Sequence, residues 1–463
     1  MSSTPRSSVS LAALLVAGAS FATATASWAQ TADMQALTKT ADLTQVAENI
    51  HTLKAEQVST RAQDLQSSTP LPELTQVPTQ NPEGGTSPTV VTPPDEGLRF
   101  TTLPPSAPTV LQGSARPRIT RTPFKSGGLS AYAGVRQRVG RNGSINLIVE
   151  GGESIVGLDL GYTQMSRDPR RGFGVNVFST QSYVPAFRGG DREVNLLGGD
   201  TPWVDRLGAG AEIFFPIGDE IDSAFGVSYQ RVAVRDDLFG GDAFGFDELG
   251  NALTVDSDGT DDLVTLNFAA YRDRRDNGVL STEGNFLRVG IDQGFVVSGD
   301  DATFTRVGAN FVQYVPFNLF GFAEGPRTLV LNLQGGHIFG DVPPYEGFNV
   351  GGDRSVRGFR GGGIGTGRSF LIAVAEYRFP IAQLNVFSEE IDLRGALFVD
   401  FGTDFDTSDE VIGQPAIARE KPGTGFGFGA GLQAALPIGF ARVEYAFTDD
   451  DDTRFIVTLG DRF

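Results

Sequence analysis

The sequence has no cysteine and only two histidines among its 463 residues. The lack of cysteine excludes disulfides, thiolate metal sites and a lipid-modified N-terminal cysteine. Two histidines also argue against an imidazole-rich metal site. The formal net charge of −19 argues against nucleic-acid binding, which needs Lys and Arg to replace phosphate counterions. We therefore predict no metal, no cofactor and no nucleic-acid partner.

Long hydrophobic runs are also missing. The longest stretch near the start, residues 11–21, falls below the ~20 residues that a membrane-spanning helix needs. Arg6 precedes this stretch, and small residues at 27 and 29 suit cleavage after Ala29. Residues 1–29 are predicted to be a signal peptide. The alternative is an uncleaved N-terminal anchor.

Two zones follow the predicted signal peptide. In residues 30–68, Leu43, Val46, Ile50 and Leu53 recur at three- and four-residue spacing. This narrow stripe predicts a periplasmic helix over 31–66 that docks on a partner, or one that frays alone. Residues 69–117 are rich in Pro, Thr and Ser, which predicts a semi-extended linker.

From residue 118 to 463, short alternating segments are separated by Gly, Asp, Asn and Pro turns. For example, Leu329, Leu331 and Leu333 alternate with Asn332 and Gln334. A soluble β-sandwich has similar repeats. Three features favour a transmembrane barrel: segments of about ten residues, charges or Gly on the second face, and long connections that alternate with short ones.

We predict an all-β fold, a 16-stranded antiparallel transmembrane β-barrel. A closed barrel with both ends in the periplasm needs an even number of strands, and the first is expected between 97 and 124. Fifteen strands are expected near 129–138, 143–150, 154–165, 171–180, 205–216, 223–235, 261–272, 284–297, 303–315, 328–338, 369–379, 391–401, 425–435, 440–448 and 453–463.

The long connection after 328–338 contains the motif GGDRSVRGF at 351–359, which includes Arg357. If this connection folds into the lumen, the Arg357 guanidinium needs carboxylate partners. The alternation of the two following strands turns Glu376 and Asp400 inward. The spacing suggests that they pair with Arg357; alternatively, each lines a hydrated lumen.

Part of the same connection, residues 362–369, resembles a phosphate-binding loop. Arg368 stands at the Lys position, and a strand-like segment follows where a helix is needed, so nucleotide binding is not predicted. Two acidic groups need no special function. The cluster of Asp256, Asp258, Asp261 and Asp262 misses the EF-hand spacing and is read as a surface loop rather than a Ca²⁺ site, and residues 449–452 are read as an exposed turn.

Several ordered motifs resemble the Omp85 superfamily, which includes barrel-assembly factors, secretion transporters and chloroplast import pores. The loop motif, with Gly351, Gly352, Val356, Gly358 and Phe359 around Arg357, is similar to the family's sixth-loop motif. Residues 271–286 resemble a family turn, with Ser281 where Pro is common. The segments 375–381, 397–402 and 427–447 resemble its later strands.

The C-terminal strand, with Phe455, Val457, Leu459 and Phe463, is similar to the signal that barrel-assembly machinery reads. The resemblance implies a bacterial outer-membrane barrel in contact with lipid, with Arg357 held inside by Glu376 and Asp400. It implies work on a client polypeptide, inserted into or moved across the membrane. Family members usually carry periplasmic POTRA modules, but residues 31–117 lack alternating strands, so no POTRA domain is predicted.

Two other functions remain open at this stage: a gated or passive pore for solutes, and a structural or adhesive surface barrel. No Ser/His/Asp set and no HExxH motif is evident, so an enzyme is not predicted.

Overall fold

The computed structural model describes residues 99–101, 130–152, 155–238, 240–277, 280–386, 389–436 and 439–459. The predicted signal peptide (1–29) and periplasmic helix (30–68) lie outside the described residues. So does most of the predicted linker (69–117). Its residues 99–101 are an exception, because they form a strand at the start of the window in which the first barrel strand was expected.

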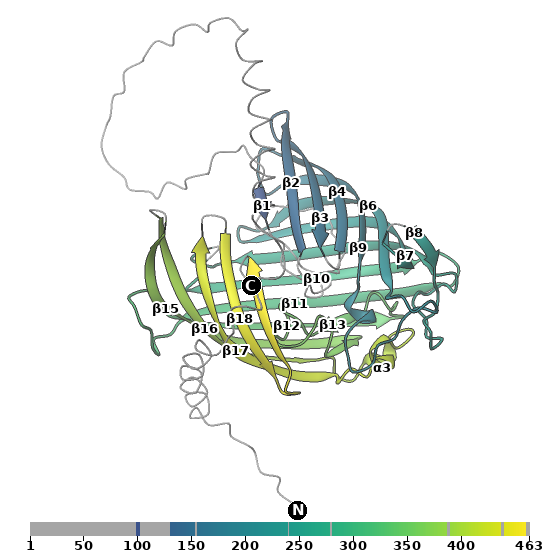
Figure 1. Ribbon diagram of the computed structural model, residues 1–463. Coiled ribbons are helices and arrows are strands. Elements are labelled where there is room, and N and C mark those ends of the chain that lie inside the picture. The colour runs from purple at the N-terminus through teal and green to yellow at the C-terminus, as the bar shows by residue number, and fades with distance from the viewer. Residues whose placement is uncertain are drawn as a thin grey trace, which may run out of the picture. The chain divides into compact units, whose positions relative to one another are not determined.

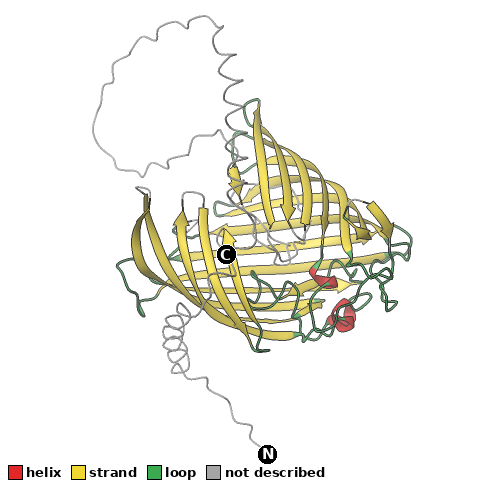
Figure 2. Cartoon of the chain, viewed as in Figure 1, coloured by secondary structure: helices red, strands yellow, loops and turns green. Residues whose placement is uncertain are grey.

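The described chain is almost entirely β-strand (Figure 2). The strands are β1 Arg99–Thr101, β2 Ser130–Val139, β3 Gly143–Gly152, β4 Ile155–Met165, β5 Gly172–Ser182, β6 Trp203–Ile217, β7 Ile221–Asp237, β8 Gly240–Ala243, β9 Thr260–Asp273, β10 Gly284–Val296, β11 Ala302–Pro316, β12 Thr328–Gly340, β13 Phe348–Val350, β14 Gly365–Gly367, β15 Ser369–Val386, β16 Glu389–Thr403, β17 Thr424–Leu436, β18 Gly439–Thr448 and β19 Thr453–Leu459. Within the described residues, three short helices lie in loops: η2 Pro185–Phe187, η3 Ser408–Glu410 and α3 Pro415–Ala418. In the described part, no helix combines the length and hydropathy needed to cross a membrane.

The wall strands follow one another in sequence order, each antiparallel to the next (Figure 1). Two steps skip small elements: β7 pairs with β9, and β12 pairs with β15. With β1 paired to β2, the described wall has the sixteen strands that were predicted, and β8 is a short addition on β7. All fifteen predicted segments correspond to wall strands. The chain forms an antiparallel transmembrane β-barrel.

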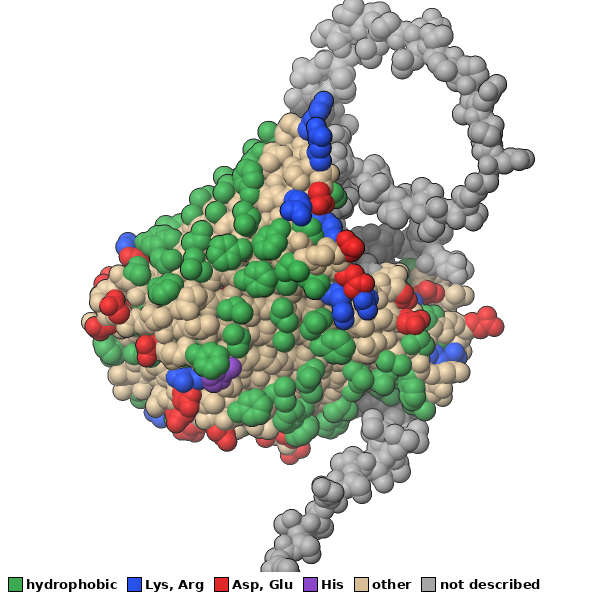
Figure 3. All heavy atoms as spheres, turned by 180° about the vertical axis from the view of Figure 1, so that it is seen from behind, with side chains coloured by type: hydrophobic (Ala, Val, Ile, Leu, Met, Phe, Trp, Pro, Cys, Tyr) green, Lys and Arg blue, Asp and Glu red, His purple; other side chains and the backbone are tan. Residues whose placement is uncertain are grey.

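Side chains alternate between the two faces of the wall because strand residues have a period of two. On β12, Leu331 and Leu333 are 42% and 50% exposed, whereas Asn332 and Gln334, which alternate with them, are buried. Figure 3 shows apolar side chains spread over the outer face of the strands, with most charged groups towards its margins. This pattern suits a wall whose outside contacts lipid and whose inside is polar.

The longest described connections lie at one end of the wall, as the sequence predicted. The described connections at the other end, the short-turn end, have at most eleven residues. The long connections 183–202, 238–259, 341–368 and 404–423 share one end, which we call the long-loop end. The lumen is not uniformly wet there. Inward-facing Val232, Val234 and Ile372 pack with loop residues such as Phe348 and Ile364 in one buried apolar cluster. The loops therefore fold into the bore and supply part of its core.

Candidate functional site

The loop from β12 to β15 places the arginine motif inside the barrel. After β13, the first strand of the β13–β14 hairpin, the chain turns at Gly351 and Gly352, which both have φ +108°. It turns again at Gly358, which has φ +98°. Residues with a Cβ rarely adopt this left-handed region. The Ser355 hydroxyl accepts a hydrogen bond from the Gly351 amide at 3.0 Å. These turns point Arg357 at the wall between β15 and β18.

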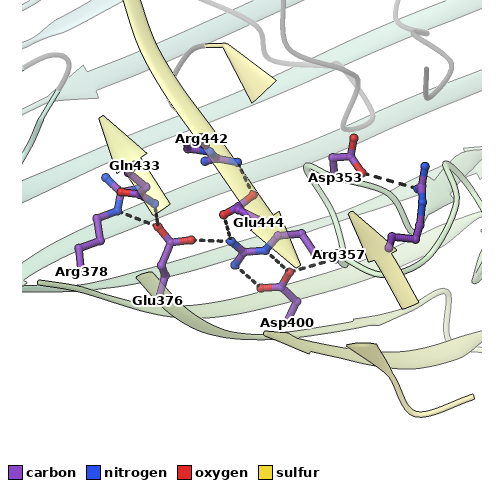
Figure 4. Close-up of polar contacts among 9 residues, drawn as sticks. Asp353, Arg357, Glu376, Arg378, Asp400, Gln433, Arg442 and Glu444 are labelled. Carbon is purple, nitrogen blue, oxygen red and sulfur yellow. Dashed lines mark hydrogen bonds and ion pairs between the residues drawn. The ribbon is translucent and has the colours of Figure 1, made fainter. Parts of the chain in front are cut away.

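Arg357 is fully buried and contacts three carboxylates (Figure 4). Its Nε and Nη2 donate to the two oxygens of Asp400, both at 2.8 Å. Its Nη1 donates to Glu376 at 2.6 Å and to Glu444 at 2.8 Å. We call these four residues the Arg357 cluster. The Arg357 main-chain N–H also donates to Asp400 at 3.0 Å, so both main chain and side chain are held.

The charges around Arg357 balance. Glu376 also accepts from Arg378 at 2.7 Å, and Glu444 accepts from Arg442 at 3.0 Å. Three buried arginines thus face three buried carboxylates. Such pairing is needed because an isolated buried charge is strongly destabilising.

The environment of Arg357 keeps its side chain protonated. Burial alone lowers the pKa of Arg357, but Asp400, Glu444 and Glu376 outweigh it and raise the pKa above its ordinary value. The guanidinium carbon also lies 3.4 Å from the ring centroid of Phe398, a cation–π arrangement. The site therefore holds a permanent cation in fixed orientation.

Strand β17 makes room for the loop because its inward residues are glycines. Phe426 and Phe428 point outward and are exposed, whereas Gly425 and Gly427 face the loop. A Cβ on Gly427 would overlap the carbonyl oxygen of Arg357, and one on Gly425 would lie 2.7 Å from the ring of Phe359. The loop main chain therefore packs directly on this strand. Without large side chains on β17, the carboxylates of β16 and β18 converge on one guanidinium.

The structure brings together Arg357, Glu376 and Asp400, the three residues that the sequence singled out. Val356 and Phe359 are also buried, and the Phe359 carbonyl accepts a hydrogen bond from Arg454 at 2.7 Å. Sequence reasoning missed Glu444 as a third partner. Its signal was present, because Arg442 and Glu444 alternate with the outward Val443 and Tyr445.

The residues proposed as an assembly signal are only partly described. Phe455 and Val457 on β19 are exposed on the outer face. Leu459 is the last residue of β19 and pairs with Ala441, and its side chain is not described. Phe463 lies outside the described residues.

The second family-like motif, residues 271–286, forms the connection between β9 and β10. The Asp276 carboxylate accepts hydrogen bonds from the Thr282 amide at 2.9 Å and the Thr282 hydroxyl at 2.6 Å. Gly284 has φ +99°, and a Cβ there would overlap the carbonyl oxygen of Arg274. Asp276 and Gly284 thus shape the turn.

The acidic residues 256–262 do not converge on one point. Asp261 is buried, against the surface-loop prediction, and accepts the amides of Val255 and Asp256 at 2.8 Å. Asp262 instead pairs with Arg231 at 3.0 Å. Among the described residues no group of three metal-ligating side chains is found. Residues 449–452 are an exposed turn, and the loop resembling a phosphate-binding loop contains β14 and runs into β15.

Comparison with known proteins agrees with the fold and the motifs. The Outer envelope protein 80, chloroplastic, of Arabidopsis thaliana is 29% identical over 74% of this chain and 44% of its own length. The rice protein of the same name (Oryza sativa subsp. japonica) is 31% identical over 74% of this chain and 48% of its own length. The chain thus spans less than half of these relatives.

A third relative, Protein TOC75, chloroplastic, of Pisum sativum, is 29% identical over 64% of this chain and 36% of its own length. The crystal structure of BamA from Haemophilus ducreyi lacking POTRA domains 1–3 is similar in fold, with a TM-score of 0.54. It is 19% identical and matches 72% of this chain and 67% of that one. The Omp85 superfamily domain matches residues 138–463. The chain belongs to the Omp85 superfamily.

Proposed function

We propose that this protein helps polypeptides insert into, or cross, the bacterial outer membrane, with the Arg357 cluster holding the β12–β15 loop inside the barrel. The proposed orientation in the membrane has the long loops outside the cell and both chain ends in the periplasm. The observation that carries the proposal is the full burial of Arg357 among Glu376, Asp400 and Glu444. No bond is made or broken in this function.

The chemistry of the cluster supports a holding role. A guanidinium that binds one carboxylate through two nitrogens is oriented as well as attracted. The carboxylates come from β15, β16 and β18, so the loop ties together the last strands of the wall. We infer that this keeps the C-terminal part of the wall in shape while a client strand contacts it. Barrel-assembly machinery is the expected partner during the protein's own folding.

A gated solute pore is the second candidate, because a loop folded into the bore narrows any conducting path. Reconstitution of the full chain in lipid vesicles separates the two. The assays are the membrane integration of an added unfolded outer-membrane barrel, scored by protease protection, and ion conductance in planar bilayers.

If the protein has the insertion role, we expect Arg357→Ala to abolish most client integration although the variant barrel still folds. If Arg357→Ala raises conductance strongly and leaves client integration at the parent level, the insertion role is wrong and the gated pore is favoured.

A further inference from the structure

The β12–β15 loop is held at a second place, before the arginine motif. Glu346 is buried, and its carboxylate accepts Arg206 Nη1 at 2.9 Å and also bonds Arg306. The carbonyl of the preceding residue, Tyr345, accepts Arg206 Nη2 at 3.2 Å. The Tyr345 hydroxyl donates to Asp261 at 2.6 Å. We call Glu346, Arg206 and Arg306 the Glu346 cluster.

The two clusters contact different arcs of the wall. Arg206 lies on β6, Asp261 on β9 and Arg306 on β11, whereas the Arg357 cluster uses β15, β16 and β18. In the order of the wall, β12 separates the β6–β11 arc from the β15–β18 arc. The loop is therefore attached to both arcs.

The polarity of the two clusters is opposite. At one arc the loop supplies a cation to wall carboxylates, and at the other it supplies a carboxylate to wall arginines. Burial alone raises the pKa of Glu346, but Arg306 and Arg206 outweigh it and lower the pKa below its ordinary value. Withdrawal of the whole loop would leave Arg206 and Arg306 without Glu346, and the wall carboxylates Glu376, Asp400 and Glu444 without Arg357.

We propose that the Glu346 cluster is a second anchor, independent of the Arg357 cluster, so that releasing either end leaves the loop tethered by the other. Release of Arg357 alone then frees the loop from the β15–β18 arc without emptying the bore. This proposal extends the role given to the Arg357 cluster above. Because it concerns the loop's attachment, it is tested without any client, and its failure is distinct from failure of the insertion role.

The absence of native cysteine allows a direct test by thiol labelling. Single cysteines are placed at Ser355, beside Arg357, and at Asn349, near Glu346; both positions are buried. Each is combined with Glu346→Gln, Arg357→Gln and both together in the full chain, folded in lipid vesicles. The rate of reaction with a membrane-impermeant maleimide is measured, and heat-modifiable gel migration verifies folding.

We expect Arg357→Gln to raise labelling at position 355 at least tenfold while position 349 stays protected, and Glu346→Gln to do the reverse. The double substitution should expose both. Glu410→Gln, at the half-exposed pair with Arg368, is the matched control and should change neither.

The proposal is overturned if Glu346→Gln exposes both positions, since the loop then has one cooperative attachment. It is equally overturned if Glu346→Gln exposes neither position. Should Glu346→Gln fail to fold, Arg206→Gln removes the same anchor from the wall side and must give the same pattern.

Discussion

At position 357 the lumen needs a guanidinium and not simply a positive charge. Arg357 binds Asp400 through two nitrogens and still reaches Glu376 and Glu444 with a third. A lysine ammonium has no planar fork and cannot reproduce this geometry. The site therefore distinguishes two side chains of equal charge.

Arg357→Gln should destabilise the barrel by roughly 3–5 kcal/mol, because removing one partner of a buried ion pair leaves the others uncompensated. Arg357→Lys should recover only part of this loss. The free energy of unfolding in urea, measured in lipid vesicles, tests both. Arg231→Gln, at an exposed pair with Asp262, is the control and should have no measurable effect. Equal stability of Arg357→Gln and the parent would contradict the account.

The Glu346 carboxylate gives a pH-dependent prediction. Its pKa in the folded protein lies below its ordinary 4.5. A lowered folded pKa adds stability above the unfolded pKa, and this is lost as the pH falls through the folded value. The thermal stability difference between the parent and Glu346→Gln should thus be constant from about pH 8 to 6 and shrink below 4.5. A difference that already shrinks between pH 8 and 6 would show another group to be responsible.

At the scale of single elements, β17 matters because its inward face lacks large side chains where the loop packs on it. Gly427 faces Asp400 in register on β16, and a Cβ there would overlap the Arg357 carbonyl. The clash of an alanine at this position cannot be relieved by moving a flexible side chain, because the Cβ would overlap a main-chain atom.

Gly427→Ala is therefore expected to displace the loop and raise thiol labelling of a cysteine at Ser355 several-fold, without loss of the β-sheet signal in circular dichroism. Gly335→Ala on β12 is the matched control, because its Cβ would meet only ordinary contacts at 3.4 and 3.6 Å. If both substitutions left the labelling rate unchanged, the packing of the loop on β17 would be wrong.

The connection between β11 and β12 carries an apolar surface at the short-turn end. Phe320 packs on Phe379 with ring centroids 4.6 Å apart, and the Tyr377 hydroxyl donates to the Phe320 carbonyl at 2.6 Å. Both partners are outward-facing residues of β15, and the turn buries them. Phe322 remains 75% exposed. Aromatic side chains at this level are typical of the membrane interface of barrels.

A polarity-sensitive fluorophore on a cysteine at Phe322 should accordingly be quenched by lipid-attached nitroxide groups. The same fluorophore at Glu324, exposed on the same turn, should be quenched less. Equal and weak quenching at both positions would place this turn in water.

At the scale of the whole molecule, much of the wall could be predicted from the sequence. In β12, for example, Leu331 and Leu333 share one face. Because strand side chains alternate with a period of two, such a pattern predicts which face of a strand points outward and which points inward. The inward parity of Glu376 and Asp400 followed from the same rule. The sequence therefore indicated two of the three strands that carry the partners of Arg357, namely those of Glu376 and Asp400.

Other features depend on long-range placement as well as on local pattern. The alternation of β18 turns Glu444 inward but does not show which residue it contacts. Glu444 joins the cluster only because β17 between it and Asp400 has glycines on its inner face. Glu346 was not singled out from the sequence, and its arginines come from strands β6 and β11, far away in sequence. The apolar packing at the long-loop end was missed for the same reason, because it forms between loops and wall.

The most direct test of the central claim, that the loop lies inside the barrel against β16, is a designed disulfide between Val356→Cys and Gly402→Cys. A Cβ at Gly402 would lie 2.6 Å from a methyl group of Val356, so the two residues are direct neighbours, and no native cysteine competes. Mild oxidation of the folded protein, followed by non-reducing electrophoresis after full denaturation, should show nearly complete cross-linking. A folded barrel whose two cysteines stay reduced and react freely with maleimide would contradict the account.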